Sequence, residues 1–271
     1  MDTLMSPAYI ALRKQLETLI IANNILHYHH VVDAYGHVSL RHPEKSDVFI
    51  MSGDKAPALV SSQADLIPYN VSDASPVDPK SKKGVVHSHS EAVLPYTMSG
   101  VPMRPTFHIA GFLGPHVPTF DIKPLYKPED QQDMLVNSQF LGSSLASKFS
   151  AEGSPNQARN VVLMTSHGFT TVGTSIQQAV YRAIYTHANA NVQTNALLIR
   201  NASMNLGSGS STTSPLEDMR YLDDDQVAGS LSMNDASQDR PWALWVREVE
   251  ASPLYSKSSS RALVVDKRFL F

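Results

Sequence analysis

The chain has 271 residues, a formal net charge of −3 and a pI near 6.4, with 42% hydrophobic and 17% charged residues. This balance is typical of a globular protein of one or two domains, and it argues against nucleic acid or an anionic membrane surface as a partner. Cysteine is absent, which excludes disulfides and thiolate zinc sites, so a transition-metal site must use histidines and carboxylates. Neither a signal peptide nor a membrane-spanning stretch is recognisable, and we expect a cytoplasmic protein.

The first hundred residues predict alternating helix and strand. Ser6 followed by Pro7 is typical of a helix start, and the apolar residues after it recur at helical spacing. Proline, serine, aspartate and lysine gather between residues 68 and 83, which indicates a loop. The predicted elements are a helix over 7–30, strands over 36–40 and 47–51, a short helical turn through 65–67, a strand at 85–86 and a helix over 91–98.

The second part of the chain predicts a buried strand, its hairpin partner and a long helix. Val161–Met164 is a continuous apolar run of strand length, and a Thr174/Gln177 or Ser175/Gln178 pair is typical of a capped helix start. Serine, glycine, asparagine and aspartate dominate 201–238, which indicates a flexible surface segment. The predicted elements are a strand over 106–112, a helix over 129–149, strands over 161–164 and 169–172, a helix to about residue 200 and a last helix over 242–249.

This order of elements predicts one main domain with a C-terminal addition. We assign residues 1–200 to the main domain, 201–238 to the flexible segment and 239–271 to an extension that packs on the main domain. Strands and helices mix along the chain without internal repeats, which indicates an α/β or α+β fold around one core.

The sequence His87-Ser88-His89 is the strongest chemical signal in the chain. It follows the β-branched pair Val85-Val86, and in an extended segment residues two apart point to the same face. Both imidazoles can therefore reach one point at the end of a strand, which is an arrangement suited to a metal ion.

His167 is the best candidate for a third ligand. It follows the predicted strand 161–164 and precedes Gly168, which lets a backbone bend closely around a ligand. Three neutral imidazoles with an open position suit Zn²⁺, Mn²⁺ or Fe²⁺. Such an ion acts as a Lewis acid that stabilises an enolate, or it activates a bound water.

At these two motifs the chain resembles the class II aldolase/adducin family, whose marks are an H-x-H pair after a strand and a later strand that ends in His-Gly. The stretches 33–43 and 103–112 are most similar to the branch typified by 3-hydroxy-2-methylpyridine-4,5-dicarboxylate decarboxylase. The resemblance implies a three-layer α/β/α sandwich with a central mixed or antiparallel sheet and a homotetramer. It also implies His87, His89 and His167 as the metal ligands, with zinc the expected ion and manganese or iron as alternatives.

The substrate loops depart from the pattern of the sugar-phosphate aldolases in that family. Those enzymes usually carry asparagine where this chain has His37, and no glycine-rich phosphate loop is present. Ser39, Ser52 and Gly53 occupy the positions of the family's substrate loops. Arg104 could pair with a substrate carboxylate, with a salt bridge as the equal alternative. These residues favour a small, carboxylated, non-phosphorylated substrate.

A second departure concerns proton transfer. Family members carry a catalytic glutamate about twenty residues before the H-x-H pair, whereas the interval 69–83 contains no glutamate and is shortened. Asp73 is the predicted substitute as a general acid or base, with Asp78 as the other candidate, and each also suits a turn.

These residues and the resemblance together lead to three candidate functions. The first is a metal-dependent lyase that cleaves a C–C bond by decarboxylation or retro-aldol reaction. The second is a non-haem iron oxygenase that performs oxidative decarboxylation, because three histidines also suit Fe²⁺. The third is a non-catalytic, adducin-like binding protein, which the missing glutamate favours and the three histidines disfavour.

Overall fold

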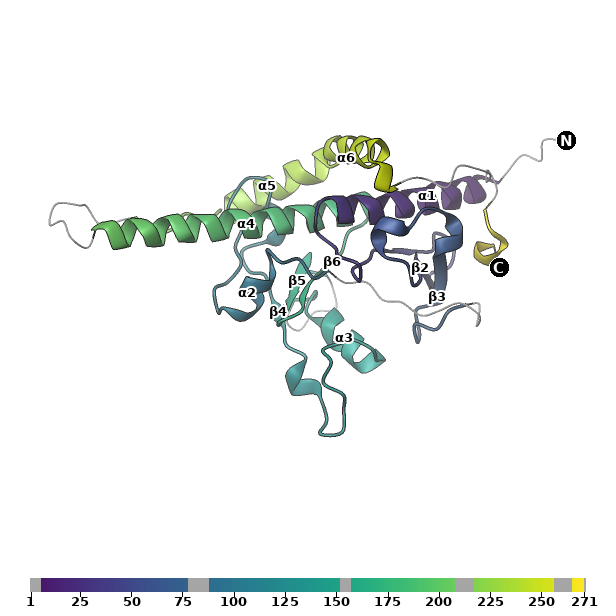
Figure 1. Cartoon of the computed structure of the whole chain (residues 1–271), viewed down its shortest axis with the longest axis horizontal. Helices are drawn as coiled ribbons and strands as arrows, with labels where there is room; N and C mark the ends of the chain where they lie inside the picture. Colours follow the sequence, from purple (N-terminus) through teal and green to yellow (C-terminus); the bar gives the residue numbers. More distant parts are fainter. Residues whose placement is uncertain (1–5, 78–87, 152–156, 208–216, 256–264, 271) are drawn as a thin grey trace.

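A long helical layer runs across the molecule above its strands (Figure 1). The computed structural model describes residues 6–77, 88–151, 157–207, 217–255 and 265–270. The two longest helices, α1 and α4, form this layer, and α5 and α6 lie on the side of it that faces away from the strands. The helices are α1 (Pro7–Tyr28), α2 (Leu94–Met98), α3 (Gln139–Ser147), α4 (Ile176–Gly207), α5 (Asp224–Ser237) and α6 (Asp239–Ala251).

The strands form two three-stranded sheets. The first is antiparallel throughout, in the order β1-β2-β3, whereas the second, β4-β5-β6, pairs β4 with β5 in parallel and β5 with β6 antiparallel. Ser88 bridges Phe169 on the outer side of β6, so pairing continues one step beyond that strand. The strands are β1 (Ser39–Arg41), β2 (Val48–Ser52), β3 (Leu66–Asn70), β4 (Thr119–Phe120), β5 (Val161–Met164) and β6 (Gly168–Thr171).

Several elements agree closely with the sequence prediction because their local signals are strong. Helix α1 begins where Ser6 accepts a hydrogen bond from the amide of Tyr9 at 3.2 Å, with Pro7 in the first helical turn. Strand β5 has the predicted bounds and is buried at every position. Helix α4 begins where the hydroxyl of Ser175 accepts from the amide of Gln178 at 3.1 Å, the second of the two predicted capping pairs.

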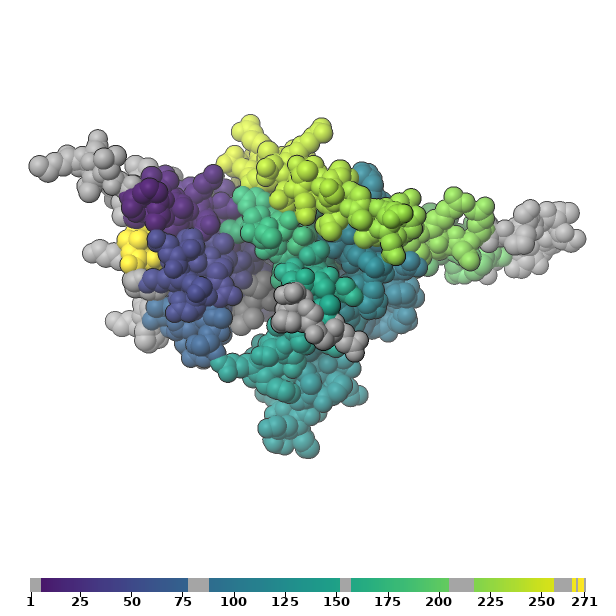
Figure 2. All heavy atoms as spheres, turned by 180° about the vertical axis from the view of Figure 1, so that it is seen from behind, coloured from purple at the N-terminus to yellow at the C-terminus, as the bar shows by residue number. Residues whose placement is uncertain are grey.

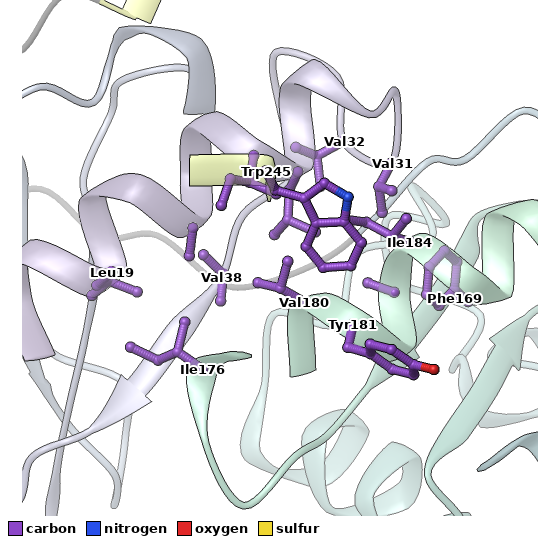
Figure 3. Packing of buried hydrophobic residues seen from close by; sticks show 14 of the residues in the cluster. Leu19, Val31, Val32, Val38, Phe169, Ile176, Val180, Tyr181, Ile184 and Trp245 are labelled. Atoms are coloured by element: carbon purple, nitrogen blue, oxygen red, sulfur yellow. The ribbon is translucent and has the colours of Figure 1, made fainter. Parts of the chain in front are cut away.

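The largest part of the core lies where α1, α4 and α6 meet. Trp245 of α6 is only 4% exposed, and its ring lies among Val32, Ile184 and Tyr181 (Figure 3). It also meets the ring of Tyr185 at 6.0 Å between centroids, a distance typical of aromatic pairs. Helix α6 thus includes the predicted helix over 242–249, and it packs against α1 and α4.

The predicted strand over 106–112 is wrong. The backbone of this segment forms hydrogen bonds with side chains of α4 and α5 and pairs with no strand among the described residues. Asn189 of α4 accepts from the amide of Thr106 at 2.9 Å and donates to the carbonyl of Arg104 at 2.9 Å. The hydroxyl of Ser230 on α5 accepts from the amide of Gly111 at 3.0 Å. Because helix side chains satisfy these backbone groups, the segment needs no sheet partner.

Two other expectations need correction. The helix predicted over 129–149 covers only Gln139–Ser147, and the segment between β4 and α3 projects away from the helical layer (Figures 1 and 2). The segment predicted as flexible, 201–238, includes the end of α4 and the whole of α5; its residues 208–216 lie outside the described part of the chain. Helix α5 begins with a capping box between Asp223 and Gln226. The polar composition of the segment led us to overlook this helix start.

Among the described residues, no helix is both long enough and apolar enough to cross a membrane. The predicted strand at 85–86 lies outside the described residues.

Trp245→Ala should lower the free energy of unfolding by about 3–5 kcal/mol, because it removes a large ring from a filled junction of three helices. Denaturant unfolding followed by circular dichroism measures the change. Leu244→Ala is the control, since Leu244 is the preceding residue on α6 and is 58% exposed. The control should change stability by no more than about 0.5 kcal/mol, and an equal loss for both variants would contradict the packing described here.

Candidate metal centre and substrate pocket

A cavity of about 540 Å³ lies where the loop before β1, the end of β2 and the end of β5 come together. Its size suits a small organic molecule. Apolar side chains make up much of the wall. The lining residues are Ala34, Tyr35, Gly36, His37, Met51, Ser52, Gly53, Asp54, Lys55, His89, Leu135, Val136, Asn137, Leu145, Met164, His167 and Thr170.

His89 and His167 lie side by side in this pocket. Their rings are stacked, with centroids 5.3 Å apart and an interplanar angle of 26°. The pKa of His167 is lowered from its ordinary value, first by burial and then by the neighbouring His89. A lowered pKa keeps the imidazole neutral at physiological pH, which is the form that binds a metal ion.

Gly168 permits this approach. The carbonyl oxygen of Ser88 accepts the amide of Phe169 at 3.1 Å, so the backbone before His89 runs directly against the backbone after His167. A Cβ atom on Gly168 would lie 1.8 Å from that carbonyl oxygen, and Gly168 has a φ of +140°, which side chains rarely adopt. Only glycine fits between the two histidine segments.

Small hydroxyl side chains fix the two histidine segments to the residues after α1, to α4 and to α2. The hydroxyl of Ser88 donates to the carbonyl of Val31 at 2.5 Å, and Ser90 is 2.8 Å from Nδ1 of His187 on α4. On the other side, the amide of Ser166 donates to Oγ1 of Thr97 on α2 at 3.0 Å. The serines on either side of His89 and the threonine of α2 thus hold the two imidazoles on rigid elements.

Asp33 contacts both His89 and the pocket wall. Its Oδ2 lies 3.0 Å from Nδ1 of His89, while its Oδ1 accepts from the amides of Tyr35 at 2.8 Å and Gly36 at 3.0 Å. Burial pushes the pKa of this carboxyl up, but the hydrogen bonds from His89 and the two amides outweigh it, so the net pKa is lowered. Asp33 is therefore an ionised acceptor at neutral pH.

His37 presents a neutral imidazole to the cavity wall. Its Nδ1 is 2.9 Å from the carbonyl oxygen of Tyr35, and since a carbonyl can only accept, Nδ1 carries the proton. Burial lowers the pKa of His37 to about 4, and its Nε2 is buried with no hydrogen-bond partner among the described residues. A neutral ring in this position gives a bound phosphate no positive charge.

Lys55 is the only cation among the described residues of the pocket wall. Its Nζ lies 2.6 Å from Oδ1 of Asp65, a carboxylate that also accepts from the amides of Ser61 and Ser62 at 2.9 Å each. Asp65 thereby fixes the lysine at the rim of the cavity, while nearly half of the Lys55 side chain stays exposed.

The pocket contains some of the predicted site residues and leaves others outside. His37, Ser52, Gly53, His89 and His167 all line it. His87, the other predicted ligand, lies outside the described residues. Among the residues that the structure describes, no group of three or more histidines and carboxylates is arranged to hold a metal ion.

Three predicted residues lie elsewhere. Ser39 is exposed and lines a neighbouring cavity of about 450 Å³. The guanidinium of Arg104 lies over the ring of Tyr221 at 4.5 Å, away from the pocket lining. Asp73 accepts from the amide of Ser75 at 2.9 Å in an exposed turn, which agrees with the turn alternative for this residue.

Sequence reasoning missed Lys55, which lines the pocket, and Asp33, which bonds to the pocket residue His89. Asp33 carried a signal, because an aspartate often forms a turn by accepting hydrogen bonds from the amides two and three residues ahead. Its partner His89 is 56 residues away in the chain, however, and no local pattern reveals that contact.

Comparison with known proteins shows the family of this chain. The family model for the class II aldolase and adducin N-terminal domain matches residues 79–194. The decarboxylase tropJ of Talaromyces stipitatus is 45% identical to this chain, over 92% of this chain and 98% of the relative. The chain belongs to the class II aldolase and adducin family.

Solved structures confirm the family's α/β fold. An L-fuculose 1-phosphate aldolase from Glaciozyma antarctica superposes with a TM-score of 0.65 at 16% identity, covering 95% of this chain and 97% of the other. An aldolase II superfamily protein from Pseudomonas syringae gives a TM-score of 0.63 at 16% identity, covering 94% and 98%. At these identities the likeness shows the fold alone, and it bears out the predicted fold class.

Gly168→Ala should separate the two histidine segments. The new methyl group would overlap the Ser88 carbonyl in a backbone conformation that alanine rarely adopts, so we expect a loss of about 3 kcal/mol or more in stability. In any folded fraction, zinc affinity should fall at least about 10-fold. Thermal unfolding and competition with a chromophoric chelator measure the two effects.

Gly142→Ala is the matched control, because a Cβ atom at Gly142 meets no atom within 4 Å and this glycine lies inside helix α3. It should be neutral or stabilise the protein by up to about 1 kcal/mol. Wild-type stability and zinc affinity in the Gly168 variant would refute the close approach.

Proposed function

We propose that the chain is a metal-dependent carbon–carbon lyase that decarboxylates a small, carboxylated, non-phosphorylated substrate, with retro-aldol cleavage as the related alternative. The observation that carries this proposal is the pair His89 and His167, stacked 5.3 Å apart in the pocket of a chain that is 45% identical to a decarboxylase. The family and this relative support a lyase, and the histidine pair supports a metal ion as its electrophile.

The donor set fits a divalent ion that accepts nitrogen ligands. His89 and His167 would hold it, with His87 as the proposed third ligand, and zinc is the ion we propose, with manganese and iron as competitors. When bound, the ion supplies a Lewis acid that draws electron density from a carboxylate or carbonyl oxygen.

The chain's own residues account for binding and orientation. Lys55, fixed by Asp65, offers a positive charge to the substrate carboxylate at the rim. Met51, Leu145 and Met164 supply apolar walls, which exclude water and strengthen the electrostatic contacts inside the pocket. The neutral His37 beside them disfavours a phosphate, which agrees with a non-phosphorylated substrate.

We further propose that the protein acts in the cytoplasm as a homotetramer. Family members are typically oligomeric, and Leu198 and Ile199 of the projecting part of α4 are 60% and 68% exposed. Apolar side chains of this size on a helix that extends beyond the body suit contact with another copy (Figure 1).

Elemental analysis and a product assay test the lyase proposal together. Protein purified from metal-replete medium should carry about one metal ion per chain, and it should release CO₂ from at least one member of a panel of keto and hydroxy carboxylic acids. His89→Ala and His167→Ala should each lower metal occupancy at least about 10-fold and reduce the rate by two orders of magnitude or more.

His108→Ala is the control, since His108 is exposed and does not line the pocket. It should keep metal and activity. Metal-free wild-type protein would overturn the proposal, and CO₂ release that consumes O₂ with Fe²⁺ would assign the chain to the non-haem iron oxygenases instead.

A further inference from the structure

The loop 33–37 ties one proposed metal ligand to the wall of the substrate pocket. Asp33 holds His89 with one carboxylate oxygen and the amides of Tyr35 and Gly36 with the other. The carbonyl of Tyr35 in turn accepts from Nδ1 of His37. Three consecutive contacts, through Asp33 and Tyr35, therefore connect the imidazole of His89 to the ring of His37, and the amide of Gly36 adds a parallel bond to Asp33. Tyr35, Gly36 and His37 all line the pocket.

Each atom in this arrangement has one chemical role. The two amides can only donate, so they fix the carboxylate plane of Asp33 and direct Oδ2 toward His89. An ionised carboxylate can only accept, so Nδ1 of His89 carries the proton at their contact. In a neutral imidazole the lone pair then belongs to Nε2, which is the atom an ion would take.

We propose that Asp33 is a positioning residue for the metal centre: it fixes the Nδ1–H tautomer and the ring orientation of His89, and it couples the bound ion to the pocket loop. The inference rests on the proposed metal-dependent function of the same pocket. A carboxylate behind a ligating histidine raises the basicity of the ligand and lowers the entropy lost when the ion binds. Asp33 itself contacts neither the ion nor the substrate.

A turn-forming role alone makes a different prediction, and one substitution separates the two. Asp33→Asn keeps an oxygen that accepts from Tyr35 and Gly36, so the turn is retained. The amide then presents a donor to the protonated Nδ1 of His89, and two donors cannot bond. Positioning therefore fails in this variant while the turn survives.

The first measurement is zinc affinity, by competition with a chromophoric chelator. Asp33→Asn should bind zinc about 10- to 100-fold more weakly than wild type. With Co²⁺ as a spectroscopic substitute, its visible absorption bands should shift or lose intensity, since the ligand field follows the orientation of the ring. Asp33→Ser, which also accepts from the turn amides and lacks the carboxylate, should weaken zinc binding similarly.

The matched control is Asp73→Asn. Asp73 accepts from the amide two residues ahead, as Asp33 does, but it lies in an exposed turn away from the pocket. Zinc affinity and the cobalt spectrum of this variant should equal those of wild type. Thermal unfolding of all the variants in chelator, without metal, should differ little, which shows that the turns remain formed.

The second measurement is independent of the ion. Nitrogen-15 NMR of histidine-labelled, zinc-free protein should show His89 in the Nδ1–H form, and Asp33→Asn should change that tautomer. An Nε2–H form in wild type, or a zinc affinity of Asp33→Asn equal to wild type, overturns the positioning role while leaving the lyase proposal intact. A wild-type protein that binds no zinc, manganese or iron overturns both.

Discussion

The contact between the backbones of Ser88 and Gly168 is the constraint on which the candidate site depends. Two segments far apart in the sequence meet there without a side chain between them, because a Cβ atom at Gly168 would occupy the space of the Ser88 carbonyl. The next residue of one segment is His89 and the preceding residue of the other is His167, so backbone contact places the two imidazoles together. The two histidines can therefore lie together only because residue 168 has no Cβ atom.

The helical layer keeps this contact in place. Ser88 and Ser90 fasten one segment to the residue run after α1 and to α4, and Thr97 of α2 fastens the other. Helix α4 also carries buried polar side chains, among them Asn189 and Gln193. These two bond to the backbone of residues 102–106, which precede β4. Such fully bonded polar contacts specify one arrangement, since displacing any of them would leave a buried group unpaired.

The pocket wall carries one lysine, Lys55, and one aspartate, Asp54, together with histidines. Lys55 is held by Asp65, and burial keeps His37 and His167 uncharged. This arrangement suits a singly charged carboxylate that approaches a metal ion more than it suits a phosphate, which requires several donors or cations.

The sequence predicted those elements whose start or burial depends on neighbouring residues alone. The capped start of α1, the apolar run of β5 and the serine cap of α4 were all readable, and so were the histidines, because their spacing relative to the strands is a local property. The strand predicted over 106–112 failed because α4 satisfies that backbone, and α5 was concealed because its polar composition resembles a linker.

The sequence by itself determined the family, the starts of α1 and α4 and the residue types able to bind a metal ion. Only the tertiary structure decided which residues share the pocket: it placed Lys55 in the wall and Asp33 against His89, and it placed Arg104 and Asp73 elsewhere. The physical reason is distance along the chain. Spacing fixes which way a side chain points on its own element, whereas a contact such as Asp33 with His89 arises only when separate elements pack.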